Sequence, residues 1–413
     1  MCDAERVIGV EGYLTSSKGV KGRIKAEPSD FIVDEVFCRP FSGDGNTLIE
    51  IRSTNWETHA LAEVLAQRFD VGKKIFFAGT KDKRAITTQL FSIPTHLEMV
   101  DVSEALAGLP GIEVQDIHHS GEELRLGDHA GNSFRIKIRD HTNDWGDLAK
   151  TVDEITSFGG FPNFFGRQRF GSVRAITHTV GKFLVNGDFE GAVYSYLGDG
   201  GKGEKEEVKE ARKCVRDGRI DEALGLFPRP FSYERRMIKK LLKNGKYVTC
   251  LRSLPLYMRK LFVHAYQSYL FNELLSERLR SGTLKELCEG DYIMPFEGGR
   301  FGARPVRITR RNETAQEKVT GCEAYIMGLV PGYESTPSCE AEAKIIEAEG
   351  VRAKDFIIPD MPECSSKGTM RTLLAPLKDL KYEMEESITL TFFLYKGCYA
   401  TSLLREVMKD GNP

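Results

Sequence analysis

The pattern of apolar and polar residues predicts strands alternating with helices in the first third of the chain. The strand segments are rich in β-branched and aromatic residues, and the helical segments repeat apolar residues every three or four positions. The predicted elements are strands over 29–37, 47–53, 74–78 and 88–93, a helix capped at Asn55 or Thr58 and ending at Phe69, two strands on either side of a turn at 127–132, and a helix over 145–158. This alternation is typical of an α+β or α/β domain.

The pattern becomes mainly helical after Gly171. The clearest helical segments are 183–197, 204–215, 220–226 and 261–279. A strand pattern returns at 387–395, and a single strand is stable only within a sheet. Because the first third of the chain supplies such a sheet, we predict a sheet domain interrupted by a helix-rich insertion with its ends near residues 172 and 368.

The composition favours a protein of two or three domains without a membrane span or an export signal. The chain has 413 residues, of which 41% are hydrophobic, and no segment offers the ~20 apolar residues of a membrane helix. The first six residues lack the apolar core of a signal peptide. Nine cysteines are scattered without a Cys-x-x-Cys pair, which argues against a zinc ribbon and a disulfide framework. Such cysteines are typical of a cytoplasmic protein with reduced thiols.

The net charge of −2 gives no sign of a globally basic nucleic-acid-binding protein. Lysine and arginine are nevertheless clustered at 73–84, 235–246 and 304–311, and at Arg167 and Arg169, while acidic residues gather elsewhere. This segregation is compatible with a basic face on a neutral body and equally with ordinary solvated helix faces.

The segment 77–85 carries the strongest chemical signal. A short apolar run ends at Gly79, and Asp82 then lies among the cations Lys81, Lys83 and Arg84. Positive neighbours favour the ionised form of a carboxyl group and would place it beside a bound polyanion. An enzyme that performs carboxylate chemistry on a nucleic acid needs this arrangement, although a solvated charged loop explains these residues as well.

The segment 162–171 interleaves aromatic, amide and arginine side chains between glycines. Aromatic rings offer stacking surfaces for bases, arginine binds phosphate, and Asn163 is able to pair with a base edge. Three phenylalanines within seven residues exceed what a loop usefully exposes, so we expect at least one of them in the core. The residues concerned are Phe164, Phe165 and Phe170, together with Arg167 and Arg169.

Two further segments invite interpretation. Tyr399 follows the last strand, at a turn before a helix that begins at Thr401 or Ser402, where side chains often face a cleft. Residues 198–203 fit the Gly-x-Gly-x-x-Gly pattern of dinucleotide-binding loops. The glutamates that follow, Glu204 and Glu206 among them, would repel a pyrophosphate, and no clear buried strand precedes the loop. We therefore expect no NAD or ATP site there.

Taken together, these segments resemble the tRNA pseudouridine synthase D (TruD) family. Four family motifs recur in order along the chain, which is more specific than any one motif alone. They are Lys25-Ala26-Glu27-Pro28-Ser29-Asp30-Phe31-Ile32-Val33-Asp34-Glu35, Gly79-Thr80-Lys81-Asp82-Lys83-Arg84-Ala85, Asn163-Phe164-Phe165-Gly166-Arg167-Gln168-Arg169-Phe170-Gly171 and Gly397-Cys398-Tyr399-Ala400-Thr401-Ser402-Leu403-Leu404-Arg405-Glu406. The resemblance is weaker in the insertion.

The resemblance implies an α+β fold with a mixed, mainly antiparallel sheet flanked by helices. It implies a pseudouridine synthase catalytic domain over 1–171 and 369–413 and a helix-rich α+β insertion over 172–368, the two forming a cleft for RNA. It also implies isomerisation of uridine at position 13 of tRNA without a cofactor or metal. We expect a monomer whose partner is tRNA.

The resemblance also implies roles for single residues. Asp82 is the catalytic aspartate, Lys25 pairs with it, and Phe31, Asn163 and Tyr399 line the uridine pocket. Candidates for contact with the RNA backbone are Lys81, Lys83, Arg84, Arg167 and Arg169. Some family members carry Phe at the position of Tyr399, which favours ring stacking over a required hydroxyl, and some carry Tyr at the position of Phe164, which suggests packing.

The chemistry of pseudouridine formation suits these residues. The base must leave its stack, the N1–C1′ bond breaks, the base rotates and C5 joins C1′. Phe31 and Tyr399 would replace the lost stacking, Asn163 would hold the uracil edge, and Asp82 would act either as nucleophile or as base. The alternative hypothesis is a non-catalytic RNA-binding or RNA-chaperone protein on the same fold.

Overall fold

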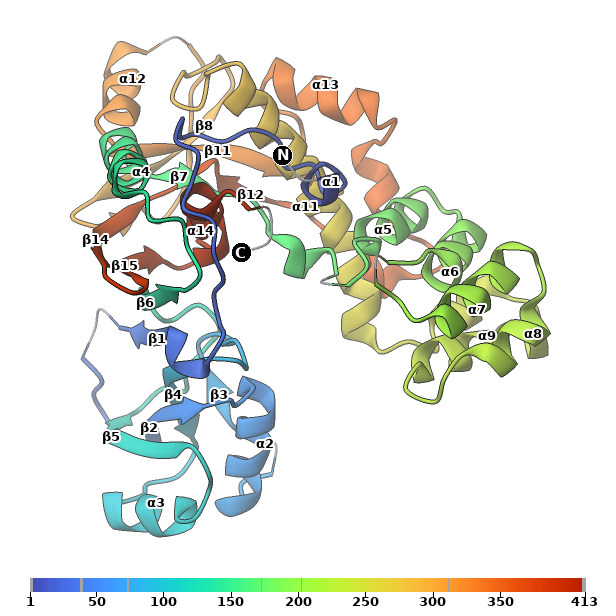
Figure 1. Ribbon diagram of the computed structural model, residues 1–413, viewed down its shortest axis with the longest axis horizontal. Helices are drawn as coiled ribbons and strands as arrows, with labels where there is room; N and C mark the ends of the chain where they lie inside the picture. Colours follow the sequence, from blue (N-terminus) through green and yellow to red (C-terminus); the bar gives the residue numbers. More distant parts are fainter. Residues whose placement is uncertain are drawn as a thin grey trace. The chain divides into compact units, whose positions relative to one another are not determined.

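The computed structural model describes residues 3–37, 40–72, 74–171, 173–201, 203–310 and 312–410. The chain divides into two compact units, both discontinuous in sequence (Figure 1). The sheet unit consists of Thr15–Phe161 and Ala375–Pro413, and the helical unit of Met1–Leu14 and Pro162–Leu374. The boundaries between the units therefore lie at 14/15, 161/162 and 374/375. The predicted domain boundaries lie at 171/172 and 368/369.

The described residues of the sheet unit form one eight-stranded sheet in the order β14-β15-β6-β1-β4-β2-β5, with β3 paired with β4. The strands are β1 (Phe31–Val36), β2 (Asn46–Thr54), β3 (Phe76–Phe77), β4 (Ile86–Ile93), β5 (Ile112–Ser120), β6 (Gly131–Ile138), β14 (Leu377–Met384) and β15 (Ile388–Tyr395). The pair β1–β4 is parallel and the other pairs are antiparallel. The predicted mixed, mainly antiparallel sheet is confirmed.

The strand near the C-terminus joins this sheet as predicted. β15 pairs along its whole length with β6 and also with β14. The prediction of two strands over 123–139 is wrong in its first half, because the strand before β6 is β5, which ends at Ser120. Leu124, within the predicted strand, has a buried side chain but lies in a loop.

Four α-helices in the described residues of the sheet unit pack against the sheet. They are α2 (Thr58–Arg68), α3 (Met99–Leu106), α4 (Trp145–Phe158) and α14 (Ala400–Met408). The helices α4 and α14 share an apolar core with β1, β6 and β15, and α2 and α3 share a second core with β2 and β4. The first residue of α2 is Thr58, and the carboxylate of Glu57 caps the helix by accepting a hydrogen bond from the backbone N–H of Ala60.

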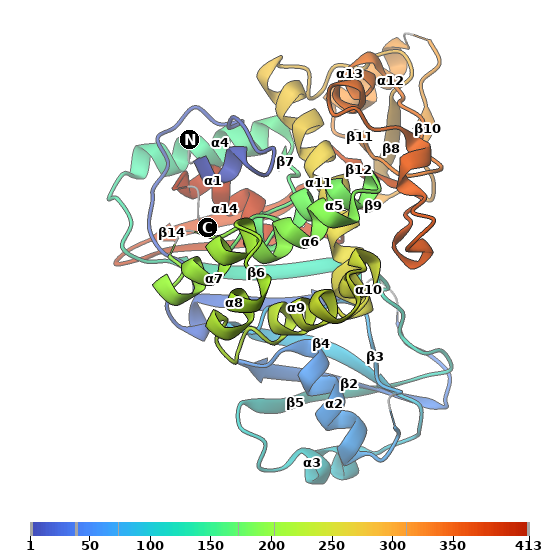
Figure 2. The same ribbon diagram turned by 90° about the vertical axis from the view of Figure 1, so that its right-hand side faces the viewer.

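The helical unit combines a group of helices with a smaller sheet (Figure 2). Its helices are α1 (Asp3–Arg6), α5 (Thr177–Val185), α6 (Phe189–Gly198), α7 (Glu206–Arg216), α8 (Ile220–Leu226), α9 (Ser232–Asn244), α10 (Tyr247–Leu251), α11 (Leu256–Arg280), α12 (Glu313–Thr320) and α13 (Glu340–Ala348). The sheet has the order β10-β8-β11-β12, with β9 paired with β8, over β8 (Tyr292–Glu297), β9 (Arg300–Phe301), β10 (Val306–Arg307), β11 (Ala324–Val330) and β12 (Thr369–Thr372). Strands β7 (Phe161–Pro162) and β13 (Leu374–Ala375) include the positions where the chain passes between the units.

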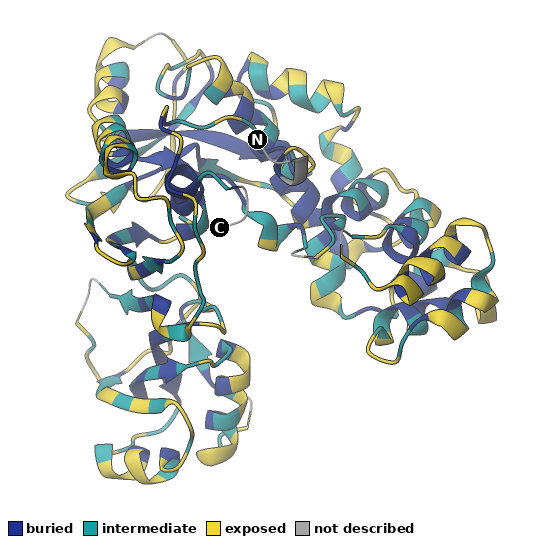
Figure 3. Ribbon diagram, in the orientation of Figure 1, coloured by how far each residue is buried: buried dark blue, intermediate teal, exposed yellow. Residues whose placement is uncertain are grey.

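Two features of the helical unit differ from the prediction. The single helix over 183–197 is two helices, because Gly187 has φ +72° and the side chain of Asp188 starts α6 by accepting the N–H of Gly191 at 2.7 Å. The positions of the strands of the smaller sheet were not predicted. Its strand β11 is buried at every residue, as the dark blue arrow in Figure 3 shows.

None of the helices in the described part of the chain combines the length and apolar composition that crossing a bilayer requires.

Candidate active site

Asp82 lies in the loop between β3 and β4 of the sheet unit. Its carboxylate oxygen Oδ2 accepts a hydrogen bond from Nζ of Lys25 at 2.7 Å. The side chain of Asp82 is 38% exposed and that of Lys25 is 18% exposed. The structure thus brings the two residues together, with the carboxylate open to solvent and the ammonium group more deeply buried.

Hydrogen bonds fix the backbone of the Asp82 loop on both sides of the carboxylate. The bonds join the loop to a neighbouring strand, to the start of α2 and to the segment before β1. Gln89 Nε2 donates to the carbonyl of Gly79, the N–H of Lys81 donates to Thr58 Oγ1 at 2.8 Å, and Arg84 Nη2 donates to the carbonyl of Ala26 at 2.7 Å. The last bond ties the loop to the segment that carries Lys25. A carboxylate held in this way needs little reorganisation before it reacts.

The three cations beside Asp82 point to different places. Lys81 turns inward, where Nζ lies 2.6 Å from Glu35 Oε1, and the two side chains are only 6% and 1% exposed. Burial raises the pKa of Glu35, and the charge and hydrogen bond of Lys81 oppose that rise. A phosphate would have to break this pair to reach Lys81. Lys83 and Arg84 are exposed.

Phe31 is buried at the start of β1 and supports Lys25. Nζ of Lys25 lies 4.0 Å from the centroid of the Phe31 ring, and Phe134 packs edge-on against the same ring. Lys25 has φ +55°, a left-handed conformation that costs free energy for a residue other than glycine. A uracil could stack on the face of Phe31 only after the ammonium group moved.

A partly buried ion pair anchors the turn between Lys25 and Phe31. Arg139, which directly follows β6, donates to both carboxylate oxygens of the buried Asp30 at 2.8–3.0 Å. Burial of Asp30 opposes its ionisation, but these bonds and the N–H of Glu27 outweigh burial and lower its pKa.

The turn over 127–130 connects the Asp82 loop to the segment that carries Tyr399. The N–H of Gly127 donates to the carbonyl of Ala78 at 2.7 Å, and the carbonyl of Gly127 accepts from Lys396 Nζ at 2.9 Å. Tyr399 precedes the first residue of α14 and is 37% exposed. The turn thus joins Ala78 and Lys396, the residues that directly precede the second and fourth motifs.

His129 is a residue of this turn that sequence reasoning missed. A methyl group at Gly79 would lie 3.3 Å from Cε1 of His129, so the imidazole packs directly against the Asp82 loop. Burial, with the nearby charges of Lys81 and Lys396, lowers the pKa of His129 to about 4. The ring is therefore neutral at neutral pH. The sequence around His129 does not reveal this environment, because Lys81 and Lys396, whose charges lower its pKa, are distant in sequence.

Asn163 lies in the helical unit and is buried there. Its Nδ2 donates to the carbonyl and the hydroxyl of Thr372 at 3.1 and 3.2 Å, and its Oδ1 accepts from Arg371 Nη2. The guanidinium group of Arg371 lies over the ring of Phe165, 4.3 Å from its centroid. The structure thus shows Asn163 holding Arg371, a residue that sequence reasoning missed because the two are 208 positions apart.

The phenylalanines of the third motif belong to the interior. Phe164, Phe165 and Phe170 are all buried, so the expectation of at least one core residue is met by all three. Arg167 and Arg169 are half-buried on a short 3-10 turn over Arg167–Arg169, and the guanidinium group of Arg169 lies 5.4 Å from the Phe165 centroid.

The glycine-rich loop after α6 is already occupied by a side chain. The carboxylate of Glu204 accepts the N–H of Gly201 at 3.2 Å and pairs with Arg212. The loop follows a helix rather than a strand, and residue 202 lies outside the described residues. A carboxylate at this amide leaves no support for pyrophosphate binding.

Within the described residues, one group has donor atoms close enough for a metal ion. Asp44, His96 and His119 place them within 4.8 Å of one another. The two nitrogens of His96 already contact Asp44 at 2.8 Å and Glu98 at 3.1 Å. These carboxylates raise the pKa of His96, so the group is better explained as an exposed hydrogen-bonded cluster.

Comparisons with known proteins fit this arrangement. A family model described as "tRNA pseudouridine synthase D (TruD)" matches residues 7–407. The chain belongs to the TruD family. Two relatives named "Probable tRNA pseudouridine synthase D" come from Thermococcus sibiricus and Methanosarcina mazei. The first is 37% identical and the alignment covers 96% of this chain and 97% of the relative; the second is 38% identical with 98% of each covered.

A solved TruD structure has the same fold. The crystal structure is from Methanosarcina mazei, is 36% identical in sequence and superimposes with a TM-score of 0.85 over 99% of this chain and 98% of the other. The predictions of the TruD family, of an α+β fold and of an isomerase of the pseudouridine synthase class are confirmed.

Proposed function

We propose that this protein converts a uridine of tRNA to pseudouridine and that Asp82 is the catalytic carboxylate. The observation that carries the proposal is the Asp82 loop, in which an accessible carboxylate is held 2.7 Å from the ammonium group of Lys25. Membership of the TruD family supplies the substrate class, and position 13 of tRNA rests on the family resemblance alone. We further propose that the enzyme acts in the cytoplasm, as a monomer and without a cofactor.

The surroundings of Asp82 suit a reaction that starts with a carboxylate. The ammonium group of Lys25 holds the carboxylate at 2.7 Å, and a carboxylate serves either for attack at C1′ or for removal of a proton. Tyr399 offers an exposed ring for stacking with an extruded base. The expected contact between Asn163 and the uracil edge stays a prediction.

Tritium release from C5 tests the proposal directly, because C5 loses its hydrogen to solvent when it joins C1′. An unmodified tRNA transcript labelled at C5 of its uridines is incubated with wild type and with Asp82→Asn. We expect release by wild type alone, with tRNA affinity and far-UV circular dichroism unchanged in the variant. The modified position is then mapped by primer extension after carbodiimide treatment.

Turnover by Asp82→Asn would refute the role of the carboxylate. Tight binding of several tRNAs without release by wild type would refute the isomerase and favour the RNA-binding protein on the same fold.

A further inference from the structure

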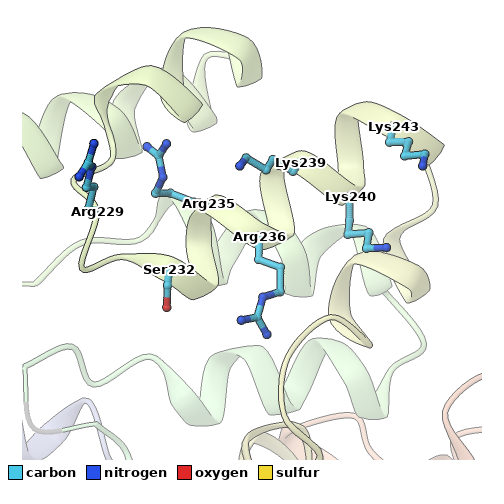
Figure 4. Close-up of a pocket in the computed structure, with 7 residues that line it drawn as sticks. All are labelled: Arg229, Ser232, Arg235, Arg236, Lys239, Lys240 and Lys243. Atoms are coloured by element: carbon cyan, nitrogen blue, oxygen red, sulfur yellow. The ribbon is translucent and has the colours of Figure 1, made fainter.

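Helix α9 of the helical unit presents an almost purely cationic surface. Six basic side chains and one serine line a hollow of about 440 Å³ along this helix and the turn before it (Figure 4). They are Arg229, Ser232, Arg235, Arg236, Lys239, Lys240 and Lys243, and we call the six basic residues the α9 patch. Arg235 is half-buried, and the other five are exposed.

The amphipathic pattern of α9 explains why no acid lies on this surface. Met237, Ile238 and Leu241 face the core, and so does Glu234, which is the single acidic residue of the helix. Its carboxylate lies 3.3 Å from Arg174 Nη2 within the unit. The outward face of α9 therefore keeps its cations without a carboxylate of its own.

Other lysines of the helical unit form ion pairs with glutamates. Lys209 lies 2.6 Å from Glu206, Lys213 lies 4.0 Å from Glu210, and Lys344 lies 2.6 Å from Glu340. In the part of the chain that the structure describes, no residue of the α9 patch forms an ion pair with a carboxylate. Like charges gathered without counter-charges raise the local potential and attract polyanions. This contrast separates the α9 patch from an ordinary solvated helix face.

Aromatic side chains border the α9 patch. The guanidinium group of Arg236 lies 5.7 Å from the centroid of the Tyr233 ring. Tyr257, at the start of α11, is 66% exposed, and its hydroxyl lies 3.5 Å from that of Tyr233. Tyrosine and arginine planes beside a row of lysines are suited to nucleic acid, since bases or riboses stack on the rings while the cations bind phosphates.

We infer that the α9 patch binds the sugar-phosphate backbone of the tRNA substrate. The inference rests on the proposed function for the identity of the RNA. Arg235 donates to the carbonyls of Leu224 and Phe227 and so borders the row. The exposed residues Arg236 and Lys243 are seven residues apart, about 10 Å along a helix, a length that matches a few successive phosphates of an RNA strand. The α9 patch does not discriminate between base sequences, and it contributes electrostatic affinity for the backbone.

The test removes three lysines from the α9 patch. The triple variant Lys239→Gln, Lys240→Gln, Lys243→Gln keeps helix propensity nearly unchanged. We expect its Kd for unmodified tRNA at 150 mM salt to rise by about tenfold or more, and the slope of log affinity against log salt to become shallower by about 2–3. In the tritium assay KM should rise, while kcat at saturating tRNA stays at the wild-type value.

The matched control removes three paired lysines from the same unit. The variant Lys209→Gln, Lys213→Gln, Lys344→Gln loses the same formal charge and should keep the wild-type Kd and salt slope. Equal Kd and slope in wild type and the α9 variant, or equal losses in the two triple variants, would overturn the inference. Circular dichroism of each variant confirms the fold. The proposed function is judged separately by tritium release from wild type, which requires none of these variants.

Discussion

From its pairing with Asp82 we propose a positioning role for Lys25. Nζ is 2.7 Å from the carboxylate, and the ammonium group also lies over the Phe31 ring. Both contacts orient the side chain toward the aspartate rather than toward solvent. A lysine that gripped RNA phosphates would need the opposite orientation.

We predict that Lys25→Met lowers turnover more than RNA affinity. Displacing a reacting group by about 1 Å costs about 10²-fold in rate, so we expect a loss of kcat of that order with a Kd for tRNA close to wild type. Single-turnover tritium release and filter binding measure the two quantities. Equal losses in kcat and affinity would contradict a positioning role.

Tyr399 is predicted to act through its ring. Tyr399→Phe should stay near wild-type activity, whereas Tyr399→Ala should lose the base stacking that is worth about 1–3 kcal/mol. Activity of both variants on the same tRNA decides the point. A severe defect in Tyr399→Phe would instead assign the hydroxyl a part in proton transfer.

At the scale of elements, the loop between β3 and β4 depends on the ion pair between Lys81 in the loop and Glu35 in β1. The side chains of both residues are almost fully buried. We predict that Glu35→Ala destabilises the protein by about 3–5 kcal/mol, because it leaves a buried ammonium group without a partner. Urea unfolding measures the loss, and the double variant Glu35→Leu, Lys81→Met should recover most of it.

The single variant Lys81→Met separates structure from RNA contact. It should lower stability without changing the salt dependence of tRNA binding. If stability held and the salt slope fell by about 1, Lys81 would be a phosphate ligand after all.

The turn before β1 gives the sheet unit a dependence on acid pH. The folded-state pKa of Asp30 is lowered, since its bonds with Arg139 and Glu27 outweigh the effect of burial. A carboxyl group whose pKa is lowered in the folded state stabilises the fold at pH values above its unfolded pKa of about 3.9. This stabilisation is lost as the pH falls through the folded-state pKa. We therefore predict that the thermal midpoint of wild type drops more steeply below pH 4 than that of Asp30→Asn. Parallel profiles for the two proteins would contradict this.

Local sequence was sufficient to predict some elements and insufficient for others. The strand over 388–395 and the turn at Asp82 are marked by neighbouring residues, so pattern alone located them. The inward turn of Lys81 depends on Glu35, which is 46 positions away. The resemblance implied an α+β insertion, but pattern did not locate its strands, since β9 and β10 have two residues each and β8 contains Pro295. The roles of His129 and Arg371 depend on distant partners in the same way.

At the scale of the whole molecule, the proposed catalytic pair and the α9 patch belong to different units. Asp82, Lys25, Phe31 and Tyr399 belong to the sheet unit, whereas Asn163 and the α9 patch belong to the helical unit. A net charge of −2 conceals this division, because the acidic residues that balance α9 lie on other elements.

The discontinuous sheet unit has a consequence for synthesis on the ribosome. β6 pairs with β15, and all of residues 162–374 are translated between them. The helical unit therefore has its whole sequence before the sheet unit does. Until β15 emerges, β6 has an unpaired edge, and such edges promote aggregation. A nascent chain that stalls before residue 388 would thus contain the whole sequence of the helical unit together with an unfinished sheet, whose open β6 edge exposes it to aggregation.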